Sequence, residues 1–195
     1  MTQPQLDKSN IVSFLADIFE NRGAEDYLGE QVTMAEHMLQ GALLGEHEGA
    51  TDELIAAALL HDIGHFTSEF GAYSPQDTKD KHHDAAGARV LEPFFPPTVT
   101  ECVRLHVAAK RYLCTIDPDY AGKLSDASIH TLSLQGGPMS EDEVSDFQSN
   151  PYHNEAVRVR LWDDGGKIPG VKTKSFSDYK DMLQRIVDEA DIEVK

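Results

Sequence analysis

Cysteine, basic residues and long apolar runs are all scarce in this 195-residue chain. Cys102 and Cys114 are too few for a disulfide scaffold and predict reduced thiols in a cytoplasmic protein. No apolar run reaches the roughly 18 residues that a membrane-spanning helix needs. The polar first ten residues also lack the apolar core of a signal peptide. We therefore expect a protein without a membrane partner.

Basic residues are outnumbered two to one, because 17 Lys and Arg face 34 Asp and Glu, which gives a net charge of −17. A field of this sign repels nucleic acid and anionic lipid and keeps a protein in solution. The composition therefore argues against a nucleic-acid partner. A small anionic substrate remains compatible with it if a few cations are concentrated at one site.

Apolar residues recur at helical spacing, for example at Ile11, Phe14, Leu15 and Ile18, and strand signals are weak. This pattern predicts an all-α fold of about eight helices in a single domain spanning 1–195, with 1–10 as a loose N-terminal segment. The expected helices cover 11–20, 32–46, 51–65, 82–91, 124–134, 154–163 and a last segment with Phe176, Tyr179, Met182, Leu183 and Ile186, and two more begin at capping boxes, Thr98–Glu101 and Ser140–Glu143. Residues 66–81 are expected to form a surface loop.

The chain is organised around residues 59–65, where His61, Asp62 and His65 end the most apolar helix. A helix that is apolar on most sides is expected inside the protein. His61 and His65 are four residues apart, so we expect them on one helical face. Buried ionisable groups are costly unless they are paired or bind a metal. The stretch therefore predicts a metal site.

Other interior positions carry metal-ligating side chains. His37 and His106 lie on apolar helical faces, His83 begins a helix of small residues, and Asp163 ends a helix. Singly, each histidine is more often a core or surface residue than a ligand, but four histidines around one His-Asp pair change that weighting. Spacing alone leaves His82 open against His83, and Asp164 open against Asp163. His47, His130 and His153 have polar neighbours and are expected at the surface.

The ordered set resembles the HD-domain superfamily, with its H…HD…H…H…D pattern, which implies a compact HD-domain helical bundle. More narrowly, several segments resemble the C–P-bond-cleaving, mixed-valent diiron oxygenases of this superfamily, over about residues 11–190. These segments are Tyr27–Glu30, Glu36–His37, Leu59–His65, His106–Leu113, Leu124–Ser128, Gln135–Met139 and Trp162–Asp163. The segments at His106 and Gln135 are the specific ones, because generic HD phosphohydrolases do not share them.

This resemblance implies two iron ions as an Fe(II)/Fe(III) pair and O2 as co-substrate. His37, His61, Asp62 and Asp163 would bind one iron and His83 and His106 the other, with Asp62 bridging. Tyr27, Glu30, His65 and Lys110 would be catalytic, and these four would bind substrate together with Ser128, Gln135 and Arg160. In such relatives the tyrosine occupies an iron when substrate is absent, and the glutamate meets the substrate's nitrogen.

The implied reaction cleaves a 1-hydroxyalkylphosphonate oxidatively and follows a 2-oxoglutarate-dependent hydroxylase in a pathway. Phe66, Phe70 and Tyr73 could offer aromatic faces to a quaternary ammonium. They favour (R)-1-hydroxy-2-(trimethylamino)ethylphosphonate, which gives glycine betaine and phosphate. The alternative is (R)-2-amino-1-hydroxyethylphosphonate, which gives glycine and phosphate.

Two other classes of function stay open at this point. One is a metal-dependent HD phosphohydrolase, which would activate water against a phosphate ester, and the other is a non-catalytic regulatory HD domain. Plainer interpretations of the residues also exist. Lys110 and Arg160 could lie on a solvated helix face, Ser125 or Ser128 could cap a helix, and the segment after Gln135 could be a simple turn.

Overall fold

The computed structural model describes residues 5–24, 30–67 and 77–192, and it confirms the all-α fold, since these residues contain ten α-helices and no β-strand. The α-helices are α1 (Ile11–Asp17), α2 (Met34–His47), α3 (Asp52–Leu60), α4 (Gly64–Thr67), α5 (His83–Leu91), α6 (Pro97–Ile116), α7 (Asp126–Leu134), α8 (Glu141–Ser149), α9 (His153–Gly165) and α10 (Lys180–Glu189). A π-helix, η1 (Ile18–Arg22), continues α1, and two 3₁₀-helices are η2 (Ala121–Lys123) and η3 (Phe176–Tyr179).

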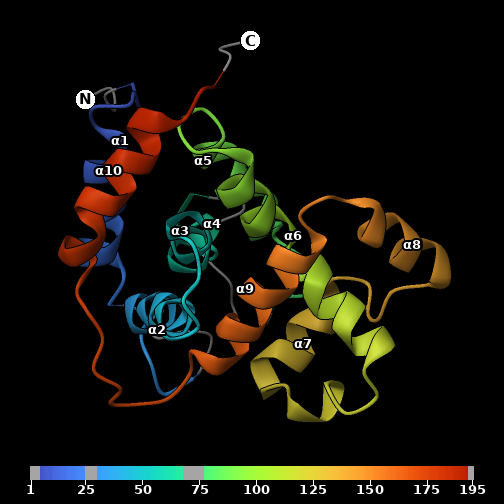
Figure 1. The fold of residues 1–195 in the computed structure, drawn as a ribbon. Coiled ribbons are helices and arrows are strands. Elements are labelled where there is room, and N and C mark those ends of the chain that lie inside the picture. The colour runs from blue at the N-terminus through green and yellow to red at the C-terminus, as the bar shows by residue number, and fades with distance from the viewer. Residues whose placement is uncertain (1–4, 25–29, 68–76, 193–195) are drawn as a thin grey trace.

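Helix α3 is the centre of the fold. It packs against α2, α6 and α9, and all its residues from Leu54 to Leu60 are buried. In Figure 1, α1 and α10 lie on one side of α3, and α7 and α8 lie on the other. Because α3 has no exposed face beyond its first turn, whatever follows its last residue is placed inside the protein.

The helix starts follow the capping signals in all but one case. Thr51 caps α3, and Ser140 and Glu143 form the expected capping box of α8. The box expected at Thr98–Glu101 is wrong, because α6 already begins at Pro97. Proline suits the first helical position, where its fixed φ is helical and its missing N–H would have no partner.

The expected single helix from Thr51 to His65 is also wrong, because α3 ends at Leu60 and α4 begins at Gly64. Between them the backbone bonds tighten to a three-residue spacing, with the amides of Ile63 and His65 donating to the carbonyls of Leu60 and Asp62. His61 and His65 therefore do not share one helical face. The His65 ring instead stacks on His83, with centroids 4.1 Å apart.

Two glycines allow α4 and α5 to approach this closely. A Cβ added at Gly64 would lie 1.7 Å from the carbonyl oxygen of His83, and one at Gly87 would lie 3.2 Å from the amide nitrogen of Gly64. Gly87, one of the small residues that follow His83, thus lies directly against Gly64. This approach is what brings the His65 and His83 rings together.

The substitution Gly64→Ala is expected to destabilise the protein by about 3 kcal/mol, because backbone must move to admit the methyl group. The measurement is the urea midpoint of unfolding. Gly122→Ala is the matched control, since a Cβ there meets nothing within 4 Å and its φ is ordinary for an L-residue. Equal midpoints for the two variants would contradict the proposed close contact.

None of the helices within residues 5–24, 30–67 and 77–192 combines the length and the apolar character that crossing a bilayer requires.

Candidate metal centre

Two pairs of buried histidines converge behind the end of α3. The Nε2 atoms of His37, on α2, and His61, just after α3, are 3.0 Å apart. The Nε2 atoms of His83, on α5, and His106, on α6, are also 3.0 Å apart. All four side chains are buried. The four predicted histidines therefore come together from separate elements.

Asp62 lies between the two pairs, and each of its oxygens faces one of them. Its Oδ2 is 3.5 Å from His37 Nε2 and 3.4 Å from His61 Nε2. Its Oδ1 is 3.3 Å from His83 Nε2 and 3.5 Å from His106 Nε2. Two groups of ligand atoms that could each hold a metal ion result, His37–His61–Asp62 and Asp62–His83–His106. They share the Asp62 carboxylate.

The hydrogen bonds of the rings fit metal ligation. Nδ1 of His37, His61 and His106 lies 3.0, 2.8 and 2.7 Å from the backbone carbonyl oxygens of Gly166, Ala58 and Val103, respectively. A carbonyl only accepts, so each Nδ1 carries the proton and, in a neutral ring, each Nε2 presents a lone pair. Two lone pairs at 3.0 Å repel each other unless a cation lies between them. Such carbonyl contacts also orient histidines that ligate metals.

The carboxylates of Asp62 and Asp163 favour a positive charge between the histidine rings. Although burial alone would lower the pKa of His61, Asp62 and Asp163 outweigh it and raise this pKa to about 9. Burial likewise would raise the pKa of Asp62, but His61 and three imidazole hydrogen bonds hold it well below its usual range. A metal cation supplies the same positive charge as a proton on the ring would.

The structure distinguishes between the neighbouring candidate ligands that spacing left open, His82 or His83 and Asp163 or Asp164. His83 is buried, whereas 64% of the His82 side chain is exposed, and His82 adopts a left-handed φ of 50° at the start of α5. Asp163 lies with Oδ1 3.5 Å from His37 Nε2, and this oxygen is buried without a hydrogen-bond partner in the described part of the chain. Asp164 points elsewhere and pairs with Arg160 and Tyr120. The geometry therefore favours His83 and Asp163 as ligands.

A cavity adjoins this cluster, and several cationic side chains line it. Its lining includes nine of the predicted metal ligands and substrate-binding residues, namely Asp62, His65, His83, His106, Lys110, Ser128, Gln135, Arg160 and Asp163, together with Lys79, Lys81 and Thr131. Lys110 and Arg160 are buried, so they do not lie on a solvated helix face. The cavity therefore has the local concentration of cations that an anionic substrate would need in a protein with a net charge of −17.

Hydrogen bonds fix the side chains on the cavity wall. Lys110 Nζ donates to Thr131 Oγ1 over 2.8 Å, and Thr131 Oγ1 donates to the carbonyl of Ser128 over 3.1 Å. Lys167 Nζ donates to Ser128 Oγ over 3.0 Å. Ser125, not Ser128, caps α7, which leaves the Ser128 side chain to the cavity. Gln135 ends α7, and its Oε1 is buried without a hydrogen-bond partner among residues 5–24, 30–67 and 77–192.

Burial shifts the protonation of two cavity groups. Burial, with the nearby His83, lowers the pKa of His65 to about 3, so its ring is neutral near pH 7. Burial, with the nearby Arg160, lowers the pKa of Lys110 to about 7. The Lys110 amine is therefore poised to gain charge when an anion arrives beside it.

Some expected site residues are not placed in the cavity. Tyr27, Phe70 and Tyr73 lie outside the described residues. Glu30 does not appear in the cavity lining, and its Oε1 is buried without a hydrogen-bond partner in the described part of the chain. Phe66 packs against the core near Val32 and Met34 and does not line the cavity.

Sequence reasoning missed Thr131, Lys167 and Tyr120, which hold Lys110, Ser128 and Arg160. Their spacing carries no usable signal, because Lys167 lies beyond Gly165, where α9 ends, and each of the three is 21 to 40 positions away from the residue that it holds. Of the three histidines expected at the surface, His47 is exposed, whereas His130 and His153 are half-buried, and none of the three lines the cavity.

A helical bundle with a buried His-Asp pair among further histidines is the arrangement of a metal-binding HD domain. The HD-domain family model matches residues 34–163, well over half of the chain, and the chain belongs to that family. It is 55% identical over 184 residues to a [1-hydroxy-2-(trimethylamino)ethyl]phosphonate dioxygenase (glycine-betaine-forming) of Leisingera caerulea, covering 94% of each chain. It is 44% identical over 169 residues to a hydroxymethylphosphonate dioxygenase of Gimesia maris, covering 86% of this chain and 84% of that one. An uncharacterized protein, L432, of Acanthamoeba polyphaga mimivirus is 33% identical over 185 residues, covering 92% of this chain and 83% of that one.

The lowered pKa of Lys110 predicts how stability depends on pH. Because its folded pKa, about 7, lies below the unfolded value near 10.4, the unfolded chain binds more protons between these limits, and stability rises with pH across this window. Lys110→Met removes this cost. We expect it to raise the melting temperature of the metal-free protein at pH 6 by at least about 3 °C, the shift produced by 1 kcal/mol.

The gain from Lys110→Met should shrink as the pH approaches 10, and differential scanning calorimetry from pH 6 to 10 measures it. Lys123→Met is the matched control, because Lys123 is exposed and its removal should leave the melting temperature nearly unchanged at every pH. A Lys110→Met protein that melts below the parent at pH 6 would show that the charged amine stabilises the fold.

Proposed function

We propose that the chain is a metal-dependent dioxygenase that cleaves the C–P bond of a 1-hydroxyalkylphosphonate, most specifically of (R)-1-hydroxy-2-(trimethylamino)ethylphosphonate, to glycine betaine and phosphate. The observation that carries the proposal is the shared Asp62 carboxylate between two buried histidine pairs, next to a cationic cavity. The activity named for the relative from Leisingera caerulea, which matches nearly the whole chain, supports it.

In this proposal the two groups hold an Fe(II)/Fe(III) pair. His37, His61 and Asp163 would ligate one iron, His83 and His106 the other, and Asp62 both. Imidazole suits iron, and a carboxylate has two oxygens to share between two cations. When bound, the metals supply Lewis acidity and a place for O2 to be reduced. The buried walls around them keep bulk water away from the reacting bond.

The cationic side of the cavity suits the phosphonate. In this proposal a phosphonate oxygen would accept hydrogen bonds from the Lys110 ammonium, the Arg160 guanidinium, the Ser128 hydroxyl and the Gln135 amide, and these four cavity-lining residues make up the phosphonate-binding wall. Neutral His65 can donate a hydrogen bond without repelling Lys110. Arrival of the anion raises the pKa of Lys110 again, so binding takes up a proton near pH 7.

The nitrogen end of the substrate would be met by Glu30, and Tyr27 would occupy an iron when substrate is absent, as the resemblance implies. A carboxylate attracts either a primary ammonium or a trimethylammonium, so (R)-2-amino-1-hydroxyethylphosphonate remains the alternative substrate. Hydroxymethylphosphonate is a second candidate, favoured by the activity named for the relative from Gimesia maris. Hydroxymethylphosphonate has no nitrogen for Glu30 to meet, so it would be bound by the phosphonate-binding wall alone.

The reaction balances with one O2 per phosphonate. Carbon 1 passes from the hydroxyl level, bonded to phosphorus, to a carboxylate, which removes four electrons. O2 accepts four electrons, and its two atoms appear in the carboxylate and the phosphate. The hydroxyl at carbon 1 has to be present beforehand, which fits a preceding 2-oxoglutarate-dependent hydroxylase.

The substrate test compares the three hydroxyphosphonates at equal enzyme concentration by phosphate release. We expect kcat/KM to be highest for the trimethylammonium compound and at least about tenfold lower for hydroxymethylphosphonate, because loss of one ion pair to a carboxylate costs about that factor. Glu30→Gln should shrink this difference, while Glu36→Gln, in the capping box of α2, should not. Phosphate release from a nucleotide or phosphate ester without O2 would instead indicate a phosphohydrolase.

The metal assignment predicts different losses for different ligands. Protein purified without oxygen should hold two irons, Asp62→Ala should lose both, and His83→Ala should lose only one. The exposed His47→Ala is the control and should retain two. Metal analysis gives the count, and electron paramagnetic resonance detects the mixed-valent pair. Two irons in Asp62→Ala would overturn the bridging role.

Salt dependence separates the field of the cavity from the field of the whole protein. A net charge of −17 repels an anionic phosphonate, so screening by salt would raise kcat/KM if that field dominated. We expect the opposite, a fall of about threefold between 10 and 200 mM salt, because local cations steer the anion inward. Lys79→Gln should flatten this fall, while Lys172→Gln, outside the cavity lining, should not. A rise of kcat/KM with salt would contradict the attraction.

A further inference from the structure

Arg160 has hydrogen-bond contacts to four protein side chains. Its Nη1 donates to Asp163 Oδ2 over 2.6 Å, and its Nε donates to Asp164 Oδ2 over 3.0 Å and to Tyr120 Oη over 3.1 Å. Its Nη2 donates to Asp164 Oδ1 and approaches Ser128 Oγ at 3.4 Å. Only 3% of Arg160 is exposed.

A guanidinium has five N–H donors in a fixed plane. One is directed at Asp163, two at Asp164, with Tyr120 sharing one of these, and one at Ser128. A single Nη1 hydrogen is left without a partner among the described residues, so only one direction remains for a ligand. Because the plane is rigid, the two contacts to Asp164 fix where this hydrogen points.

Tyr120 completes the arrangement from a distant part of the chain. It lies between α6 and η2, is buried, and packs in a small cluster with Leu113 and Leu124. Its hydroxyl donates to Asp164 Oδ2 while it accepts from Arg160 Nε. Burial and the nearby Asp164 raise the pKa of Tyr120, so the hydroxyl keeps the proton that it donates. Asp164 itself is partly exposed and has Lys167 Nζ 3.8 Å from its Oδ1.

We propose that Tyr120 and Asp164 are positioning residues that lock the Arg160 guanidinium in one plane, so that it joins the carboxylate of Asp163 to the phosphonate-binding wall. They act through Arg160 and do not touch the substrate. This inference rests on the proposed function for the identity of the anion. A purely structural role would stabilise the fold without changing anion affinity.

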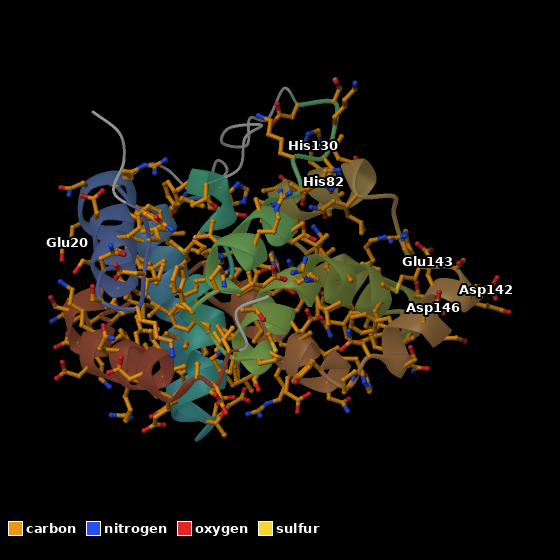
Figure 2. The ribbon with its side chains drawn as sticks, turned by 90° about the horizontal axis from the view of Figure 1, so that it is seen from above. Glu20, His82, His130, Asp142, Glu143 and Asp146 are labelled. Carbon is orange, nitrogen blue, oxygen red and sulfur yellow. The ribbon has the colours of Figure 1, made fainter. Side chains whose placement is uncertain are left out.

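The sign of one substitution separates positioning from simple electrostatics. Asp164→Asn removes a negative charge near the cavity, so electrostatics alone predicts tighter binding of an anion. Loss of positioning predicts weaker binding. We expect the iron-loaded protein to bind inorganic phosphate, measured by titration calorimetry, about tenfold more weakly, since the charge-assisted bonds to Arg160 are lost. Asp146→Asn, on the outward edge of α8 that Figure 2 labels, is the charge-matched control and should change nothing.

Tyr120→Phe keeps the ring packing and removes only the hydroxyl. We expect phosphate affinity to fall and the KM for the hydroxyphosphonate to rise by about fivefold, the worth of one hydrogen bond, with kcat within about twofold. Iron content and melting temperature should stay close to those of the parent. Tyr112→Phe is the matched control, because its hydroxyl accepts from Gln148 on α8, away from the cavity.

A double variant tests whether Tyr120 acts through Arg160. With Arg160→Met in place, Tyr120→Phe should have no further effect on phosphate affinity. An equal loss in both backgrounds, unchanged phosphate affinity and KM in Tyr120→Phe, or tighter phosphate binding by Asp164→Asn would each overturn the proposal. Because phosphate affinity is measured without turnover, failure of the parent protein to cleave phosphonates would refute the proposed function and leave this test standing.

Discussion

One buried carboxylate organises the centre of this protein. Asp62 presents one oxygen to His37 and His61 and the other to His83 and His106, at 3.3–3.5 Å. Four imidazoles and a carboxylate in a buried site are unfavourable unless positive charge balances them. The rest of the fold serves this arrangement. Helix α3 ends at Leu60 inside the protein and so places Asp62, two residues further on, at the centre. Helices α2, α5 and α6 each contribute one histidine to the site.

Most of the fold followed from local signals in the sequence. Helical periodicity gave the all-α class, and Thr51 and Ser140 marked helix starts correctly, because capping depends on residues within one turn. The break between α3 and α4 could not be predicted this way. It depends on the approach of Gly64 to Gly87 and to the His83 carbonyl, which lie some 20 residues further along the chain. At Thr98 the local signal itself misled, because Pro97 had already started α6.

The histidines and the aspartate of the candidate metal site could be predicted from the sequence, because metal binding explains ionisable side chains at interior helical positions. His37, His61, Asp62, His83 and His106 meet as expected, and burial favours His83 over His82. Their roles as ligands, and those of the substrate residues, stay predictions. What spacing could not indicate is the support around them. Tyr120 reaches Arg160 across 40 positions, and Thr131 reaches Lys110 across 21, so only the folded chain shows these pairs.

Charge is distributed unevenly enough to reconcile an acidic protein with an anionic substrate. Glu20 and the acidic residues of α8 lie at opposite outer edges of the molecule (Figure 2), while Lys110 and Arg160 are buried at the cavity. Burial lowers the charge state of Lys110 until an anion restores it. The stability lost by burying the Lys110 amine is tolerated at a binding site and would not be expected in a purely structural core.

The most direct measurement is the ratio of O2 consumed to phosphate released when the iron-loaded protein acts on (R)-1-hydroxy-2-(trimethylamino)ethylphosphonate. An oxygen electrode and a phosphate assay on the same sample provide it. We predict one O2 per phosphate, with glycine betaine formed in equal amount and no phosphate released when O2 is removed. Phosphate release that continues at the same rate without O2 would contradict the oxygenase.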